Sequence, residues 1–177
     1  MPDRGVGICC DPAFMPSGVD DQREVEARPD VLVCSTAPLE SDTEVTGPIT
    51  VTLYASSSAR DTDFTAKLVD VDPNGYARNL TDGIIRARYR RPEEGAELLE
   101  PGDVYEFKID LWATSNLFWK GHMIRLEISS SNFPRFDRNA NTGRPTGSDR
   151  VMVSALQTIH HDGVYPSHIT LPVVPRD

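Results

Sequence analysis

The stretch VYEFKIDLW, Val104 to Trp112, decides the fold of this chain because apolar and polar residues alternate along it without a break. The apolar positions are Tyr105, Phe107, Ile109 and Leu111, and the polar positions between them are Glu106, Lys108 and Asp110. In an extended chain, successive side chains point to opposite faces, so a period of two places all the apolar residues on one face. The stretch therefore predicts a β-strand with one buried face and one solvated face.

The same alternation recurs along the chain, in ITVTLYA (Ile49–Ala55) and HMIRLEI (His122–Ile128). We expect further strands at Val31–Ser35, Phe64–Val71, Gly83–Arg90, Gln157–His161 and Ser167–Val173. Each run is fenced by Gly, Pro, Asn or Asp, and no window of about 12 residues carries a helical stripe. Short strands at this spacing, with no helices between them, predict an all-β fold. The expected form is a jelly-roll-like antiparallel β-sandwich of the galactose-binding-like type.

The length of 177 residues, 38% of them hydrophobic, suits one domain with a single core. Residues 1–30 are expected to form an N-terminal arm or linker, because their apolar residues are few and a charged run, DDQREVEARPD, closes the segment. Residues 31–177 are expected to form the β-sandwich domain.

The composition argues against several classes of partner. A net charge of -9 repels phosphate backbones, so we expect no nucleic acid partner. No apolar run has the length of a membrane span, and the first residues lack the pattern of a signal peptide. The cysteines, Cys9, Cys10 and Cys34, form neither a disulfide framework nor a zinc motif, which favours free thiols and a cytoplasmic location.

The segment DVDPNG, Asp70 to Gly75, matches the first half of a calcium-binding loop. The twelfth position of such a loop should be a bidentate Glu, and here it is Thr81. Since strands flank the segment and Asn and Gly tolerate positive φ, we expect a hairpin turn and no metal site. Calcium should leave the melting temperature unchanged.

Nucleophilic catalysis needs a base positioned beside a nucleophile. The histidines, which are His122, His160, His161 and His168, lie in or beside expected strands, and there is no G-x-S-x-G elbow. Ser129, Ser130 and Ser131 end a strand. The carboxylates of Asp61 and Asp63 are expected on one strand face near solvent. We therefore predict no catalytic, metal-binding or cofactor-binding residue and no cofactor.

Two surface patterns leave a binding function open. Arg86, Arg88 and Arg90 are spaced by two, which predicts a basic ridge on one strand face; the glutamates that follow would neutralise it. The aromatic residues Trp112, Phe118 and Trp119 flank ATSN, an expected turn where they can stack on a sugar ring. A stand-alone carbohydrate- or protein-binding module is thus one alternative.

Three long segments, Asp61–Arg90, Leu99–Gly143 and His160–Pro175, resemble the C-terminal domain of X-prolyl dipeptidyl-peptidases and cocaine-esterase-like (CocE/NonD) serine hydrolases. The lead-in Val19–Val33 resembles this family as well. The resemblance implies an accessory β-domain whose partner is an α/β-hydrolase catalytic domain, upstream in the same or a neighbouring chain. In this family the Ser-His-Asp triad lies in that catalytic domain, so no residue here inherits a catalytic role. The substrate of the parent hydrolase, an esterase or dipeptidyl-peptidase, and homo-oligomerisation stay open.

The segment SSSNFPRFDRNANTG, Ser129 to Gly143, is irregular and polar, and it leaves a strand. We interpret it as a structural corner and a docking surface. A docking face should expose more apolar area than an ordinary monomer surface. The candidates are the arm with Val6, Ile8 and Phe14, the corner with Phe133 and Phe136, and the turn between Trp112 and Trp119. The alternative for Phe133 and Phe136 is a place in the core.

Overall fold

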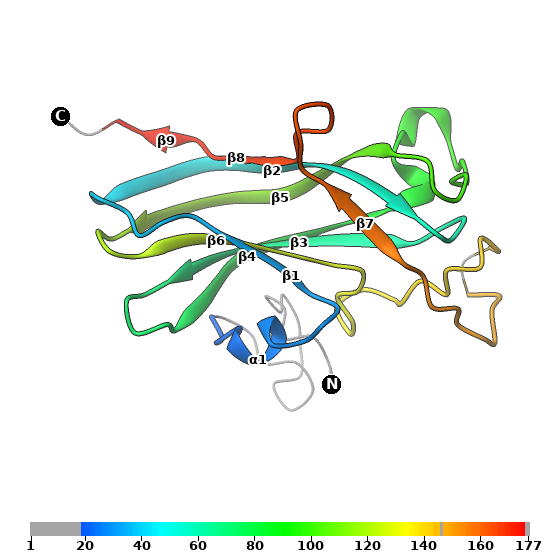
Figure 1. The fold of residues 1–177 in the computed structure, drawn as a ribbon, viewed down its shortest axis with the longest axis horizontal. Helices are drawn as coiled ribbons and strands as arrows, with labels where there is room; N and C mark the ends of the chain where they lie inside the picture. The colour runs from blue at the N-terminus through cyan, green and yellow to red at the C-terminus, as the bar shows by residue number, and fades with distance from the viewer. Residues whose placement is uncertain (1–18, 146, 176–177) are drawn as a thin grey trace.

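The computed structural model describes residues 19–145 and 147–175, and its regular structure is almost entirely β (Figure 1). The elements are α1 (Arg23–Glu26), β1 (Leu32–Ser35), β2 (Thr43–Ser57), β3 (Asp63–Val71), β4 (Ala77–Arg86), the 3-10 turns η1 (Ala87–Tyr89) and η2 (Pro92–Glu94), β5 (Tyr105–Phe118), β6 (Met123–Ser129), β7 (Gln157–His160), β8 (His168–Thr170) and β9 (Val173–Val174). Every stretch expected to be a strand contains one, so the all-β prediction is confirmed. None of the described helices is long and apolar enough to cross a membrane.

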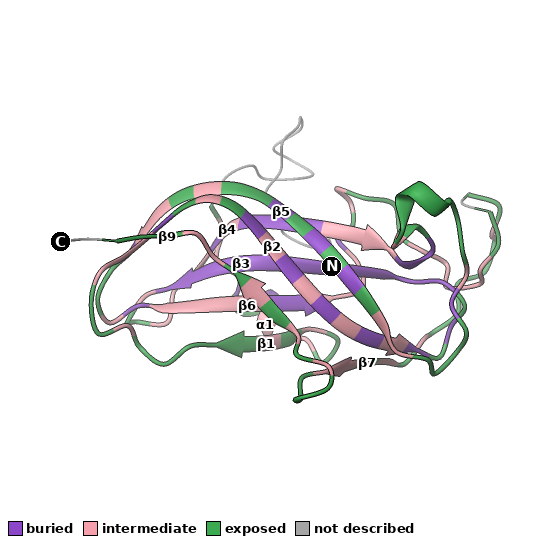
Figure 2. Cartoon of the chain, turned by 90° about the horizontal axis from the view of Figure 1, so that it is seen from above, coloured by how far each residue is buried: buried purple, intermediate pink, exposed green. Residues whose placement is uncertain are grey.

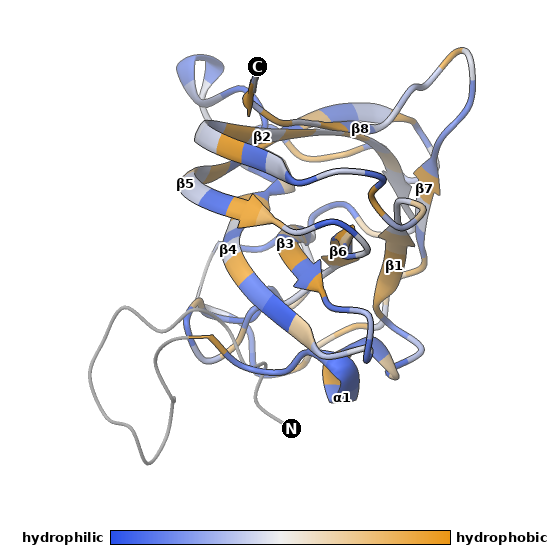
Figure 3. Ribbon diagram, turned by 90° about the vertical axis from the view of Figure 1, so that its left-hand side faces the viewer, coloured by the Kyte–Doolittle hydropathy of each residue, from blue (hydrophilic) through white to orange (hydrophobic). Residues whose placement is uncertain are grey.

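The strands form two sheets that face each other. Sheet A is four-stranded, in the order β1-β6-β3-β4, and sheet B is five-stranded, with the order β5-β2-β7 and with β8 and β9 also paired to β2. All the pairings are antiparallel. Seen along the strands, the two layers lie one above the other, with β1 and β7 on the same side of the molecule (Figure 3). The expected antiparallel β-sandwich is therefore confirmed.

The core follows the alternation that the sequence shows. In β5, Phe107, Ile109 and Leu111 are fully buried, whereas the residues between them are exposed, which gives the striped strand in Figure 2. Strand β2 is striped in the same way. Their apolar faces meet Phe64, Leu68 and other residues of sheet A in one cluster. Burial of such side chains contributes about 25 cal/mol per Å² of apolar area, which makes this cluster the main source of stability.

Strand β3 departs from the alternation because it is buried on both faces. The lead-in to the sandwich covers part of its outer face. Gln22 is fully buried there and accepts a hydrogen bond from the ammonium group of Lys67 at 3.3 Å. Glu26, in α1, pairs with Arg125 of β6 at 2.7 Å. The lead-in is thus attached to sheet A by buried polar contacts. The expected docking candidate with Val6, Ile8 and Phe14 lies outside the described residues.

The expected strand Gly83–Arg90 is wrong in its second half. Strand β4 ends at Arg86, and the chain turns into η1, where the Ala87 amide donates a hydrogen bond to the Thr62 carbonyl at 2.9 Å. Beyond that point the three arginines no longer follow a strand period. The basic ridge is therefore not present, and each arginine pairs with a different carboxylate.

The expected turn around ATSN is also wrong, because β5 continues through it to Phe118. The ladder between β2 and β5 shifts register between Pro48 and Thr50, and Trp112 opposite this point has a φ of 63°. A residue in this left-handed region and an interrupted ladder are typical of a β-bulge. The Trp112 amide donates to the Asp110 carboxylate at 2.7 Å, which stabilises the bulge locally. A bulge accommodates the irregular sequence without ending the strand.

Candidate functional site

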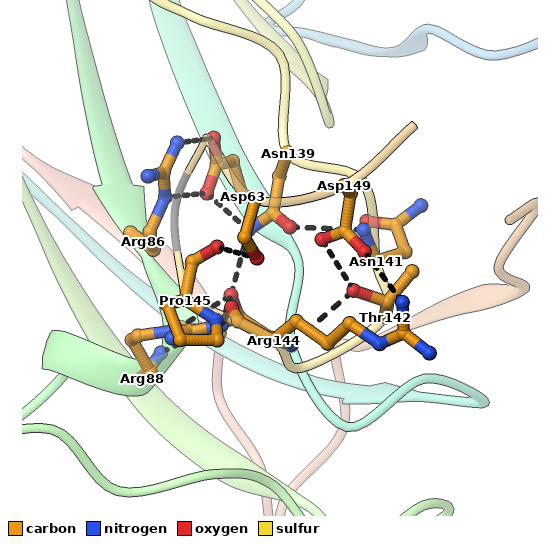
Figure 4. A network of polar contacts seen from close by, with 12 residues as sticks. Asp63, Arg86, Arg88, Asn139, Asn141, Thr142, Arg144, Pro145 and Asp149 are labelled. Atoms are coloured by element: carbon orange, nitrogen blue, oxygen red, sulfur yellow. Dashed lines mark hydrogen bonds and ion pairs between the residues drawn. The ribbon is translucent and has the colours of Figure 1, made fainter. Parts of the chain in front are cut away.

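The carboxylates of Asp61 and Asp63 are buried, with 1% and 2% of their surface exposed, so their expected position near solvent is wrong. Asp63 accepts two hydrogen bonds from Arg86, at 2.9 and 3.1 Å, and this pairing raises the pKa of the guanidinium further above its ordinary value. Asp61 accepts hydrogen bonds from the backbone and the side chain of Arg88, at 3.0 and 2.8 Å. Two carboxylate–arginine pairs thus lie side by side at one end of the sandwich (Figure 4).

Asn139 connects these pairs to the long loop that follows β6. Its side-chain amide donates to both Asp61 and Asp63, at 2.9 Å each, and its oxygen accepts the Asn141 amide at 2.9 Å. Asn141 in turn donates to the carbonyl of Val153 at 2.8 Å, which closes the loop on itself. We call residues 130–156 the corner loop; the buried carboxylates are its anchors.

A second set of contacts holds the far part of the corner loop. The Thr142 hydroxyl donates to Asp149 at 2.6 Å, and the Arg88 guanidinium donates to the carbonyl of Arg144 at 2.7 Å (Figure 4). At the other end of the loop, the buried Asp82 accepts hydrogen bonds from Asn132, at 2.6 Å, and from Arg135. Polar networks that are satisfied inside a protein fix one arrangement of the chain. The corner loop therefore has a defined shape without regular secondary structure.

The outer surface of the corner loop is apolar and basic. Phe133 and Phe136 are 41% and 36% exposed, so they are not core residues, and the guanidinium groups of Arg138 and Arg135 lie over their rings. Other large apolar side chains are exposed on the same loop: Val151, Met152, Val153 and Leu156. A hollow of about 780 Å³ beside them is lined by Arg60, Arg144 and Arg150 among other residues. The exposure at Phe133 and Phe136 is what a docking surface requires.

The calcium-like segment is a hairpin, as expected. The Asp72 side chain accepts hydrogen bonds from the amides of Asn74 and Tyr76, and Gly75 has a φ of 85°. The other carboxylate of the half-motif, Asp70, is hydrogen-bonded to the ring of His122 at 2.8 Å. Across the described ranges, no three His, Cys, Asp or Glu side chains gather as they would around a metal ion.

One serine lies beside a histidine in the described part of the chain. The Ser56 hydroxyl is 3.3 Å from Nε2 of His160, on neighbouring strands of sheet B. A working nucleophile also needs a group that orients the histidine and donors for an oxyanion. Within the described residues no carboxylate hydrogen-bonds to the His160 ring, and the centroid of the Tyr165 ring lies 5.4 Å from that of His160. This pair therefore has the geometry of an ordinary cross-strand contact.

The remaining predicted positions are dispersed. His161 and His168 lie at the edge of sheet B, and Ser129 bonds to Thr65 at 2.6 Å. Trp112 and Trp119 are exposed. Trp112 lies within β5 and Trp119 directly follows its last residue, so they do not share a turn. The signal for the buried anchors is a matched spacing of two where two strands pair. Asp61 and Asp63 stand just before and at the start of β3, Arg86 and Arg88 stand at and just after the end of β4, and Asp63 is opposite Arg86.

The sequence of the chain is similar to a known domain family and to known esterases. The family model of the X-Pro dipeptidyl-peptidase C-terminal non-catalytic domain matches residues 11–170. A cocaine esterase of Rhodococcus sp. is 49% identical over 90% of this chain, and the chain covers 28% of that protein. A putative serine esterase of Mycobacterium bovis is 34% identical over 66% of the chain, which covers 21% of it.

Two solved structures share the fold and part of the sequence. An aminopeptidase from a marine sediment archaeon, Thaumarchaeota archaeon, has a TM-score of 0.84 and 35% identity over 89% of the chain, which covers 28% of it. An alpha-amino acid ester hydrolase has a TM-score of 0.83 and 33% identity over 88% of the chain, which covers 27% of it. The chain thus spans little more than a quarter of these relatives. It belongs to the family of C-terminal non-catalytic domains found in X-Pro dipeptidyl-peptidases and CocE/NonD hydrolases.

Proposed function

We propose that the chain serves a serine hydrolase that cleaves esters or amides, X-Pro peptide bonds among them, and that the corner loop docks on the catalytic domain. One observation carries the proposal: the match to a non-catalytic domain extends over most of the chain but over only 28% of the cocaine esterase. The remainder of such a relative must contain the reacting groups. The role of this domain is then to support and position the catalytic part.

The length of the corner loop, its buried anchors and its exposed apolar side support this role. Long loops without regular structure inside a compact domain are usually functional. Here the loop is held from beneath by buried carboxylates, while its exposed side presents aromatic and aliphatic groups. Such a combination of a rigid backbone and an apolar surface suits a permanent contact with another domain.

The charge at the corner loop indicates what charge the partner surface should carry. The chain as a whole carries a net charge of -9, yet exposed arginines gather at this end: Arg60, Arg138, Arg144 and Arg150. Complementary charge steers and orients docking surfaces. We therefore expect the catalytic domain to present carboxylates where it meets the corner loop.

A chimera tests the proposal. The chain replaces the matched region of the Rhodococcus cocaine esterase, and ester hydrolysis and melting temperature are measured. We expect a single cooperative unfolding transition and kcat/KM within about tenfold of the relative, because the docking surfaces of 49% identical domains should be compatible. The double substitution Phe133→Lys and Phe136→Lys should lower the melting temperature of the chimera and leave the isolated chain nearly unchanged.

The matched control is Val164→Lys, which places a lysine at an exposed aliphatic position in the loop between β7 and β8, away from the corner loop. This substitution should leave the melting temperatures of both the chimera and the isolated chain unchanged. If the chimera unfolds in two independent transitions and the corner substitutions have no effect on it, the docking role is wrong.

A stand-alone carbohydrate-binding module is the second candidate, favoured by the exposure of both tryptophans of the chain. Sugar rings stack on exposed indoles. Since Trp112 and Trp119 are the sole source of tryptophan fluorescence, titration with a panel of oligosaccharides reports binding directly. A saturable change that is lost in Trp112→Ala would favour this candidate over the accessory role.

A further inference from the structure

The sandwich is open along one side, and the opening is apolar. A slot of about 440 Å³ enters between the two sheets there. We call it the edge slot; its aliphatic lining consists of Leu32, Val51, Leu53, Leu68, Ile124, Leu126, Ile128, Ile159, Ile169 and Leu171. The remaining lining residues are Cys34, Ser35, Thr36, Arg125, His161, Ser167 and His168. Half-buried side chains of both sheets, such as Leu126 and Ile169, are therefore reachable from outside, and the core residues Val51, Leu53 and Leu68 lie behind them.

The geometry of the strands explains the opening. On the opposite side, the sheets are so close that a Cβ atom on Gly83 of β4 would lie 2.1 Å from the carbonyl oxygen of Asp110 in β5. On the open side, β1 is a short edge strand, and Leu32 and Cys34 on its inward face stay exposed although β7 of sheet B lies on the same side. Leu32 is 44% exposed and Cys34 is an exposed free thiol, and most of β1 has the colour of exposed residues in Figure 2.

The edge slot is continuous with the corner loop. It shares Leu32, Ile128 and Ile159 with a neighbouring hollow of about 540 Å³. That hollow in turn shares Asn141 and Ser154 with the hollow of about 780 Å³ beside the corner loop. The three hollows therefore lie next to one another, from the open side of the sandwich to the surface proposed to dock on the catalytic domain.

We infer that the edge slot receives an aliphatic segment of the catalytic domain, which completes the core of the sandwich. This inference rests on the proposed function. The matched region is 28% of the cocaine esterase, so in that relative a large covalently attached remainder can supply such a segment, and the hollows beside the slot adjoin the proposed interface. The segment should present Leu, Ile or Val side chains, because the lining is aliphatic.

Two other occupants fit the slot less well. A fatty acid would need a cation for its carboxylate. The one arginine of the lining, Arg125, is held by Glu26 at 2.7 Å and by the Ser35 hydroxyl at 2.8 Å, and the other basic groups there are the imidazoles of His161 and His168, of which His168 is hydrogen-bonded to the Pro166 carbonyl at 2.7 Å. A second copy of the chain would bring together two molecules with a net charge of -9 each. An aliphatic segment of the catalytic domain needs no cation in the slot and does not bring two copies of this chain together.

The rate at which Cys34 reacts with a maleimide measures whether the edge slot is occupied. In a background with Cys9→Ser and Cys10→Ser, maleimide labelling of Cys34 is timed in the isolated chain and in the chimera with the Rhodococcus relative. We expect labelling at least tenfold slower in the chimera, because the segment covers the thiol. Leu32→Lys should lower the melting temperature of the chimera by several degrees more than that of the isolated chain, and Val164→Lys should lower neither.

The outcomes separate this inference from the proposed function. An active chimera with slow labelling supports both, and an inactive chimera with slow labelling supports the slot alone. An active chimera whose Cys34 labels as fast as in the isolated chain overturns the slot and leaves the accessory role intact. An inactive chimera with fast labelling contradicts both.

The other occupants are tested on the isolated chain. Slower labelling on addition of decanoate, with no protection in the chimera, would show a small amphiphile in the slot and overturn the inference. Slower labelling at higher protein concentration, together with dimer elution on size exclusion, would show a second copy there and overturn it too.

Discussion

Buried carboxylates distinguish this domain from a sandwich whose loops are held only by the turn sequence. Asp61, Asp63 and Asp82 are all buried, and all of them accept hydrogen bonds from residues of the corner loop. Charged groups are rarely buried unless they are paired, because desolvation costs several kcal/mol per ion. Their pairing with arginines and asparagines of the loop makes the loop and the sandwich fold as one unit.

The first prediction concerns Asp61, the most completely paired of these carboxylates. Asp61→Ala should lower the free energy of unfolding by about 3–5 kcal/mol, because it leaves the guanidinium of Arg88 buried without its partner. Chemical denaturation monitored by circular dichroism measures the loss. Trypsin should also cleave the variant faster in the corner loop, where Arg138 and Arg144 are exposed.

The control for Asp61→Ala is Glu93→Ala, which removes an exposed carboxylate and should change stability by less than about 0.5 kcal/mol. A loss of stability in Asp61→Ala that comes without faster cleavage of the loop would contradict the anchoring role.

At the scale of elements, the close approach of β4 and β5 closes one side of the sandwich. A Cβ atom on Gly83 would lie 2.1 Å from the oxygen and 2.9 Å from the carbon of the Asp110 carbonyl, which are backbone atoms and cannot rotate away. Gly83→Ala should therefore cost about 3 kcal/mol or more, since the sheets must separate to admit the methyl group. Thermal unfolding measures the effect.

Gly163→Ala is the matched control for Gly83→Ala, because a Cβ atom there would meet no other atom within 4 Å. Its melting temperature should stay within about a degree of the parent chain. Equal losses in the two variants would mean that the close approach is not what Gly83 provides.

The turn between β7 and β8 supplies a pH-dependent contribution. The backbone amides of Tyr165 and Val164 donate to the Asp162 carboxylate at 2.8 Å each, and they lower its pKa below the ordinary value. A carboxylate whose pKa is lower in the folded state stabilises the fold above its unfolded pKa of about 3.9, and this contribution disappears as pH falls through the folded pKa.

The Asp162→Asn variant should therefore have a lower melting temperature than the parent chain at neutral pH. The difference between the two melting temperatures should become smaller as pH falls from about 5 to about 3. Differential scanning calorimetry across this pH series checks it. Glu40→Gln, at an exposed carboxylate, serves as the control and should show no such narrowing. A gap that stays constant with pH would mean that the charge of Asp162 does not contribute.

The sequence predicted the strands well where one face is buried, because the alternation in β2, β5 and β6 directly reflects burial. It failed where the chain is irregular. The residues at the end of β4 kept a period of two, but the buried Asp61 draws Arg88 into a turn. The bulge at Trp112 resembled a turn, because both interrupt the alternation. The opening beside β1 depends on which strands face each other, which the local pattern does not contain.

For the whole molecule, the corner loop and the adjoining edge slot carry many of the exposed large apolar side chains, and others, such as Tyr89, Trp119 and Val173, lie elsewhere. The corner loop presents Phe133 and Phe136, and the adjoining edge slot presents Leu32 and the half-buried residues behind it. The long outer face of β5 carries Glu106, Lys108 and Asp110, apart from the exposed Trp112. An asymmetric surface of this kind is expected when one part of a domain is covered by a neighbour.

The last prediction is that the isolated chain does not hydrolyse activated esters or X-Pro anilides above background. The one serine hydroxyl seen beside a histidine ring in the described residues is that of Ser56, and that pair lies on the outer face of sheet B without an orienting carboxylate. Rates with p-nitrophenyl acetate and an X-Pro p-nitroanilide measure the activity, and labelling by a fluorophosphonate tests for a reactive serine. Ser56→Ala should leave the background rate unchanged. Stoichiometric labelling that is abolished in Ser56→Ala would instead identify a nucleophile on this domain, and the chain would then act as an enzyme in its own right.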